Sequence, residues 1–179
     1  MVEHFDHKES FMPALSPKKR KNPANRLRRA PDAISLLKAD HRQVAQWFKQ
    51  YESARSSDRK RRLAADICAA LRVHTTIEEE IFYPAFLMAT DDKDMHHEAV
   101  VEHAGAKNLL AEIEESGPDD EYFDSKVHVL SEMIKHHVKE EEQPGGMFAE
   151  AKKSDMDLHA LGEQLMARKK QLQARSKAA

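Results

Sequence analysis

The stretch RVHTTIEEEIFYPAF, residues 72–86, decides the fold, because it sets two metal-ligand side chains on an otherwise apolar helix face. His74 and Glu78 are four residues apart, so in a helix their side chains stack about 6 Å apart on one side. Leu71 before them and Ile81 after them continue this face in steps of three, as a helix with 3.6 residues per turn requires. The apolar neighbours predict that the face is buried, and the two polar residues with it.

Three other segments repeat this pattern of a buried apolar face interrupted by ligand-type residues. The four predicted inward faces are Ile34, Leu37, His41, Val44, Phe48 and Tyr51; Ile67, Leu71, His74, Glu78, Ile81 and Ala85; His96, Ala99, His103, Ala106, Leu110 and Ile113; and Phe123, Val127, Leu130, Ile134, His137 and Glu141. Short connections force consecutive helices to run antiparallel. The sequence therefore predicts an all-α, up-down-up-down four-helix bundle.

Prolines, glycines and capping residues mark the expected helix boundaries. We expect a first helix from Pro31 to about Tyr51, a second from residues 56–58 to about Ala89, a third from Asp92 to Ser116, a fourth from Asp119 past Glu141, and a fifth over 155–175. Pro144, Gly145 and Gly146 should kink or interrupt the chain after the fourth helix. The leucine face of the fifth helix would cap the bundle or pair with a second copy, so a monomer and a homodimer both remain open.

The chain divides into a flexible basic arm (1–30), the bundle (31–152) and a C-terminal amphipathic helix with its tail (153–179). Residues 18–29 hold seven Lys or Arg and no acid. The other residues hold the remaining 22 of the 29 basic groups and all 31 acidic groups, a net charge of −9, although the net charge of the whole chain is only −2. The PKKRK run at 17–21 resembles a nuclear localisation signal. Such an arm also suits phosphates of a nucleic acid or an acidic protein partner.

Composition narrows the setting of the protein. No run approaches the roughly 20 apolar residues of a membrane helix, and the first ten residues lack the layout of a secretory signal. The single cysteine, Cys68, forms no internal disulfide and fits a reducing compartment. We therefore expect a cytoplasmic protein without membrane contact, with a nuclear location open if the basic run is a signal.

The six inward ligand-type residues predict a metal centre: His41, His74, Glu78, His103, His137 and Glu141. Burying two carboxylates without a cation would be costly. Four imidazoles with two carboxylates suit iron, manganese or zinc rather than calcium. If both glutamates bridge two octahedral ions, and an oxide or hydroxide bridges them too, roughly two of the twelve coordination positions remain open.

Residues near this cluster receive other expectations. His96 is a full two turns from His103 and is expected to be structural. Tyr83 lies between inward positions and is expected to pack near the end of the bundle. The off-face acids are expected on a solvated surface, with room for one of them to hydrogen-bond a ligand histidine; they are Glu79, Glu80, Glu140 and Glu142.

Together these stretches resemble the hemerythrin-like HHE cation-binding domain family. The matching segments are LLKADHRQVAQWF (36–48), RVHTTIEEEIFYPAF (72–86), VVEHAGAKNLL (100–110) and IKHHVKEEEQ (134–143), which fall within about residues 32–150. The resemblance implies a non-haem di-iron centre in a four-helix bundle, with family roles in binding oxygen, in sensing oxygen, nitric oxide or iron, and in stress defence.

One departure from the oxygen-carrying hemerythrins bears on function. Their third helix offers His-x-x-x-His, whereas the positions four residues from His103 here are Ala99 and Lys107. This difference disfavours simple reversible oxygen carriage. We expect a di-iron protein that binds or senses O2, NO or reactive oxygen species; the alternatives are a di-iron enzyme that decomposes peroxide or acts as an oxidase, and a protein for iron or other metal handling or storage.

Overall fold

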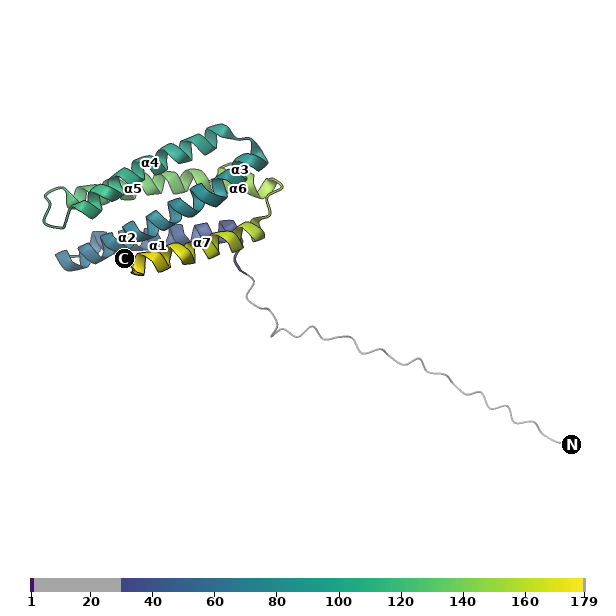
Figure 1. Cartoon of the computed structure of the whole chain (residues 1–179), viewed down its shortest axis with the longest axis horizontal. Helices are drawn as coiled ribbons and strands as arrows, with labels where there is room; N and C mark the ends of the chain where they lie inside the picture. Colours follow the sequence, from purple (N-terminus) through teal and green to yellow (C-terminus); the bar gives the residue numbers. More distant parts are fainter. Residues whose placement is uncertain (2–29, 179) are drawn as a thin grey trace.

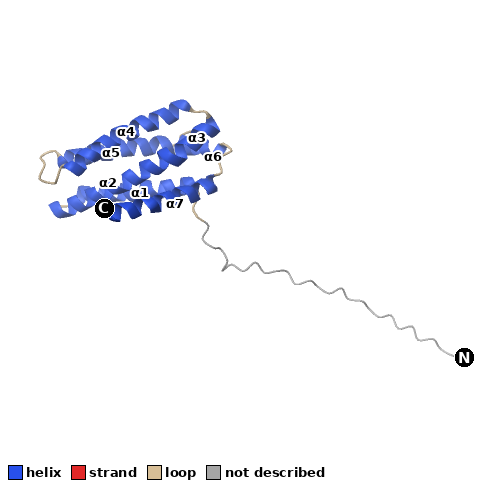
Figure 2. Ribbon diagram, viewed as in Figure 1, coloured by secondary structure: helices blue, strands red, loops and turns tan. Residues whose placement is uncertain are grey.

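A computed structural model describes residue 1 and residues 30–178, and every regular element among them is helical. The elements are α1 (Ala33–Ser53), α2 (Ser57–Ile77), η2 (Glu78–Phe82), α3 (Tyr83–Thr90), α4 (Lys93–Glu115), α5 (Phe123–Glu142), α6 (Met147–Lys153) and α7 (Leu158–Ala178). The long helices lie side by side as an antiparallel bundle (Figure 1; Figure 2). The expected fold class is confirmed. Most of the basic arm lies outside the described residues.

Polar side chains start most of the helices as expected. Asp32 caps α1 by accepting a hydrogen bond from the Ser35 N–H at 2.8 Å, and Asp92 caps α4 through the Met95 N–H at 3.0 Å. The expected start of the fourth helix at Asp119 is wrong. Asp120 accepts from the Tyr122 N–H at 2.7 Å, which holds this segment in a turn, and α5 begins only at Phe123.

The second long helical segment of the bundle, made of α2, η2 and α3, contains a π-helical turn. α2, η2 and α3 follow one another without a break, and the Tyr83 N–H bonds to the Glu78 carbonyl five residues back. The wider turn inserts one extra residue, as such π segments do, often at functional sites. The inward face consequently shifts by one: Phe82 and Phe86 are fully buried, whereas the expected Ile81 and Ala85 are only half-buried.

The bundle is closed by two further helices. α5 ends at Glu142, and the turn over 143–146 sends the chain into α6, which buries Met147 and Phe148 at the end of the bundle. α7 packs along α1 and α2, with Leu165 fully buried. The leucine face of this last helix thus caps its own bundle.

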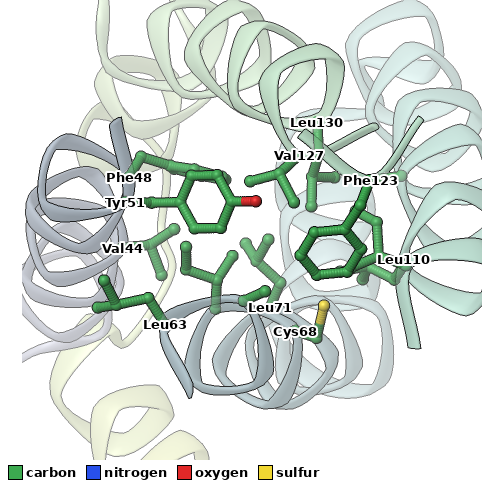
Figure 3. Close-up of a cluster of buried hydrophobic side chains, with 14 residues drawn as sticks. Val44, Phe48, Tyr51, Leu63, Cys68, Leu71, Leu110, Phe123, Val127 and Leu130 are labelled. Atoms are coloured by element: carbon green, nitrogen blue, oxygen red, sulfur yellow. The ribbon is translucent and has the colours of Figure 1, made fainter. Parts of the chain in front are cut away.

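The core consists of two apolar clusters. One, shown in Figure 3, lies among α1, α2, α4 and α5 and is centred on residues such as Phe48, Leu71 and Leu110. The other includes Leu37, Phe82 and Phe148 and lies toward α6. The helix positions between the clusters carry the buried polar residues. None of the helices in the described part of the chain is both long and apolar enough to span a bilayer.

Candidate metal centre

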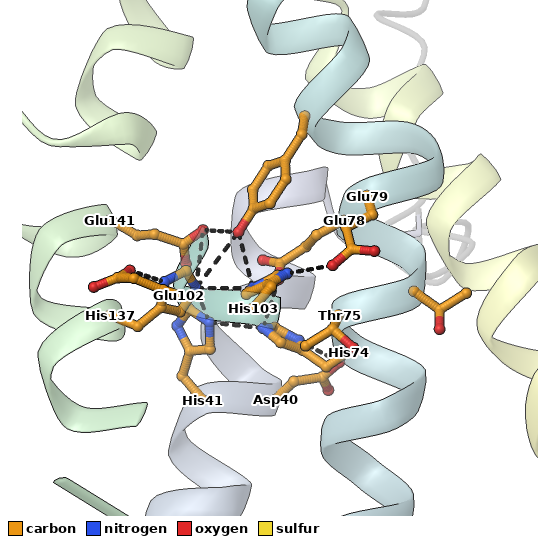
Figure 4. A network of polar contacts seen from close by, with 12 residues as sticks. Asp40, His41, His74, Thr75, Glu78, Glu79, Glu102, His103, His137 and Glu141 are labelled. Atoms are coloured by element: carbon orange, nitrogen blue, oxygen red, sulfur yellow. Dashed lines mark hydrogen bonds and ion pairs between the residues drawn. The ribbon is translucent and has the colours of Figure 1, made fainter. Parts of the chain in front are cut away.

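All six predicted ligand residues meet in one buried layer of the bundle (Figure 4). Each is at most 7% exposed, and Glu78 is fully buried. Four segments of the bundle supply them. α1 carries His41, α2 and the π turn carry His74 and Glu78, α4 carries His103, and α5 carries His137 and Glu141. Convergence of the six side chains therefore agrees with the expectation from the sequence, whereas their binding of metal stays a prediction.

The four histidines form two pairs whose Nε2 atoms face each other. His41 and His74 are 2.9 Å apart at these atoms, and His103 and His137 are 3.2 Å apart. Two imidazole nitrogens on neighbouring positions of one ion, each about 2.1 Å from it, would lie about 3 Å apart. The spacing within each pair therefore fits one metal ion per pair.

Glu78 stands between the two histidine pairs. Its Oε2 lies 3.1 Å from His74 Nε2 and 3.5 Å from His103 Nε2. Neither of its carboxylate oxygens has a hydrogen-bond partner among the described residues. A buried carboxylate left in this state is costly unless a cation or a proton joins it.

Glu141 occupies the matching position on the other side. Its Oε2 lies 3.4 Å from His41 Nε2, and its Oε1 lies 3.6 Å from His137 Nε2. Both glutamates thus face both histidine pairs, as two bridging carboxylates would. The donor set fits a pair of transition-metal ions.

Carboxylates on the far side of the rings fix the orientation of three histidines. The Nδ1–H groups donate to Glu142 from His41 (2.8 Å), to Glu79 from His103 (3.0 Å) and to Glu102 from His137 (2.7 Å). A carboxylate only accepts, so each of these Nδ1 atoms carries a proton, and the Nε2 of a neutral ring offers its lone pair inward. For His74 the corresponding acid, Asp40, is 3.6 Å away, beyond hydrogen-bond range.

These four acids form a closed ring around the bundle. Each is the immediate chain neighbour of a predicted ligand, yet each faces a histidine of the next helical segment: α1 to α2, η2 to α4, α4 to α5, and α5 back to α1. The sequence suggests at most one off-face acid hydrogen-bonded to a ligand histidine, whereas the structure has two, Glu79 and Glu142, and both stay partly exposed. The roles of Asp40 and Glu102 were not anticipated, although their position beside a ligand was a usable signal.

Burial sets the protonation of the metal-free site. It lowers the pKa of His74 to about 4 and that of His103 to about 2, so both rings are neutral and ready to bind metal near neutral pH. Burial, followed by the charge of Glu141, raises the pKa of Glu78 well above its ordinary value. A cation between the glutamates would reverse this effect and displace the proton.

Tyr83 also points into the site, which corrects its expected place near the bundle end. Its hydroxyl lies 3.1 Å from His103 Nε2 and donates to Glu141 Oε1 at 3.1 Å. The π turn is the reason, because it rotates the residue five positions after Glu78 back onto the inward face. His96 stays outside the centre, with its ring edge-on to Tyr83 at 6.2 Å.

The C-terminal helix supports the site from outside. Lys169 of α7 donates to Asp40, the acid facing His74. Arg168 makes two hydrogen bonds to Glu80 on the π turn, at 2.6 and 2.9 Å. α7 thus holds two segments that carry or face ligand residues.

A helical bundle with buried histidines and carboxylates in its middle layer defines the class of bundle proteins that bind metal cations. The sequence pattern of the family called hemerythrin HHE cation binding domain matches residues 32–144, and the chain belongs to this family. It is accordingly a cation-binding protein. The match leaves α7 outside the family domain.

Two known proteins are similar to the chain. A crystal structure of a hemerythrin HHE cation binding domain-containing protein from Mycobacterium kansasii superposes with a TM-score of 0.69 at 22% identity, covering 83% of this chain and 91% of that one. A protein called DNA nickase from Nostoc sp. is 24% identical over 110 residues. The aligned part is 60% of this chain but only 30% of the nickase. The first comparison supports the fold, and the second covers a minor part of its relative.

Proposed function

We propose that the protein holds two iron ions and uses them to bind or sense O2, NO or reactive oxygen species. The observation that carries this proposal is the pairing of the histidines around two shared glutamates. His41 and His74 would hold one ion, and His103 and His137 the other. Iron supplies the redox chemistry and the open coordination positions, and manganese or zinc suits the same donors.

The protein groups around the site would keep it ready for metal. The carboxylates on Nδ1 hold three of the four imidazoles in the tautomer that binds metal through Nε2. Phe148 stacks on the His41 ring at 5.8 Å and Phe82 packs against Phe148, so apolar rings exclude water from this end. A dry site strengthens the attraction between cations and carboxylates.

The size of a cavity beside the His103–His137 pair favours small reactants. It has a volume of about 90 Å³ and is lined by both rings of the pair together with Ala106, Met133 and Ile134. This volume is well below the roughly 300 Å³ at which ordinary small-ligand pockets begin. The cavity is therefore suited to a diatomic molecule or peroxide.

The proposal is tested by loading the full-length protein with iron under anaerobic conditions and counting metal per chain. We expect two irons per chain, and a reversible change in the visible spectrum when O2 or NO is added and removed. His103→Ala should lower the count, while His97→Ala, on the exposed side of the same helix, should leave it unchanged. One iron per chain, or a visible spectrum that does not change with O2, NO or peroxide, would contradict the proposal. Iron that exchanges freely and reacts with none of them would favour metal handling.

A peroxide-decomposing enzyme is the second candidate function, and the position of Tyr83 favours it. Burial, together with the charges of Glu78 and Glu141, raises the pKa of Tyr83 well above 10, so the phenol keeps its proton inside the site. It is placed to donate that proton during turnover of peroxide to water and oxygen. A cation between the two glutamates would offset their charges and lower the pKa of the phenol, toward the range of an effective general acid.

Tyr83→Phe is expected to lower the rate of peroxide consumption about tenfold or more, because it removes one general acid. Iron content should not change. The matched control is Tyr51→Phe, since Tyr51 is also buried and hydrogen-bonded, to Asp124 at 2.7 Å, but lies in the distant apolar cluster. Oxygen evolution from peroxide measures the rate. Equal rates in both variants would rule out Tyr83 as the proton donor.

A further inference from the structure

A groove runs along the bundle between α1 and α5 and begins at the metal centre. Its main cavity has a volume of about 340 Å³, within the range of about 300–1,000 Å³ that small-ligand pockets occupy. His41 lines it, and beyond this ring the lining combines apolar side chains with charged ones. The apolar side chains are Ala45 and Phe48 from α1 and Ile134 and Val138 from α5. The groove is therefore large enough for an organic molecule.

A second cavity extends the groove away from the metal. It has a volume of about 230 Å³ and shares Phe48, Glu52 and Ser131 with the first. Ser131 is 2% exposed, and its hydroxyl has no hydrogen-bond partner among the described residues. The side chains of the protein thus leave an elongated space unfilled, which suits a chain-shaped ligand rather than a compact one.

Two carboxylates, Glu142 and Glu52, also line the main cavity. Glu142 accepts hydrogen bonds from Lys38 at 2.9 Å and from His41 at 2.8 Å. Glu52 makes no ion pair among the described residues, but three lysines line the same cavity: Lys49, Lys135 and Lys139. The charge lining the groove is therefore positive on balance, because Glu142 is already paired and Glu52 is outnumbered by the lysines.

Two lysines at the rim of the groove carry positive charges that no carboxylate among the described residues pairs with. Lys49 on α1 and Lys139 on α5 both line the main cavity and are exposed. Neither makes an ion pair with any residue in the part of the chain that the structure describes. Two unpaired ammonium groups over an apolar floor attract an anion that carries an apolar chain.

We propose that this groove binds a medium-chain carboxylate, with its head at the lysine-lined rim and its alkyl chain along Phe48 and Ile134. The proposal goes beyond the function above, because it needs no reaction at the metal. Charge argues against two other occupants. The basic stretch 18–29 of the same chain would be repelled by the lysines, and so would the same groove of a second copy.

Calorimetric titration of the full-length, zinc-loaded protein with decanoate below its micelle concentration tests this site. Zinc has no redox chemistry, so the result is independent of any reactivity toward O2, NO or peroxide. We expect one decanoate per chain. Acetate, which lacks the chain, and decyltrimethylammonium, which reverses the charge of the head, should show no saturable binding.

Variants then locate the site. Ala45→Phe should abolish decanoate binding by filling the groove from an exposed helix position, where the added ring leaves the core intact. The double variant Lys49→Glu/Lys139→Glu should weaken it about tenfold or more, as expected for two lost ion pairs. Lys170→Glu on α7 is the matched charge control. Absence of decanoate binding, equal binding of the cationic analogue, or insensitivity to both groove variants would overturn the proposal.

Discussion

Glu78→Gln is expected to reduce the metal content from the proposed two ions per chain to one or none, and to make the stability of the protein much less sensitive to chelators. Glu78 is fully buried and faces both histidine pairs, so a neutral amide would take a bridging charge from both ions. Metal that binds only the folded state stabilises it by about 4 kcal/mol when its concentration is 1,000 times Kd. That gain disappears with the ligand.

The same variant has the opposite effect in the absence of metal. Because burial and Glu141 raise the pKa of Glu78, the metal-free wild type carries an ionisable group in an unfavourable place. An amide of the same shape removes this cost. We therefore expect metal-free Glu78→Gln to be at least as stable as the metal-free wild type. In the presence of metal the order reverses, and the wild type is the more stable protein.

Thermal unfolding with and without a chelator measures both effects. In the wild type, chelation should lower Tm by about 10 °C, which corresponds to about 4 kcal/mol for a chain of this size. In Glu78→Gln it should change Tm little. Glu115→Gln is the control, because Glu115 is exposed at the end of α4 and makes no ion pair among the described residues. Two ions per chain in Glu78→Gln would show that this carboxylate is no ligand.

Gly146→Ala is expected to destabilise the protein by about 3 kcal/mol, in the range of substitutions that force a backbone shift. A Cβ at this position would lie 2.0 Å from the Glu140 carbonyl oxygen and 3.0 Å from that of Glu141. Neither carbonyl can move freely, since both belong to the last turns of α5. The turn into α6 must open instead.

Opening this turn should also reach the metal centre. α6 places Phe148 on the ring of His41, and the turn directly follows Glu141 and Glu142. We expect Tm to fall by roughly 10 °C, together with faster loss of metal to a chelator. Gly117→Ala is the matched control, because a Cβ there meets nothing within 4 Å. Equal stability of the two variants would contradict the argument from the close approach.

The inward faces were largely predictable from the sequence because helical periodicity is a local property. On α1 every predicted inward residue from Ile34 to Tyr51 is buried, and on α4 the burial continues from Ala99 to Ile113. The same periodicity placed the six ligand-type residues on inward faces. Their convergence required only that neighbouring helices run antiparallel.

The π turn marks where this reasoning failed. A count in steps of three and four assumes 3.6 residues per turn throughout, and one inserted residue at 78–82 makes the count wrong from that point on. It placed Ile81 on the inward face and left Tyr83 off it. The run EEEIFYP gives no local signal of the wider turn, because its residues are as compatible with an ordinary helix.

The sequence alone determined that this is an α-helical bundle with six ligand-type residues in its core, because the spacing of apolar and polar residues along each helix fixes which side is buried. Only the tertiary structure decided which acid faces which histidine, that Tyr83 enters the site, and that α7 supports it. These contacts join residues on different helices, and their pairing depends on the rotation and depth of each helix in the bundle, which no single segment encodes.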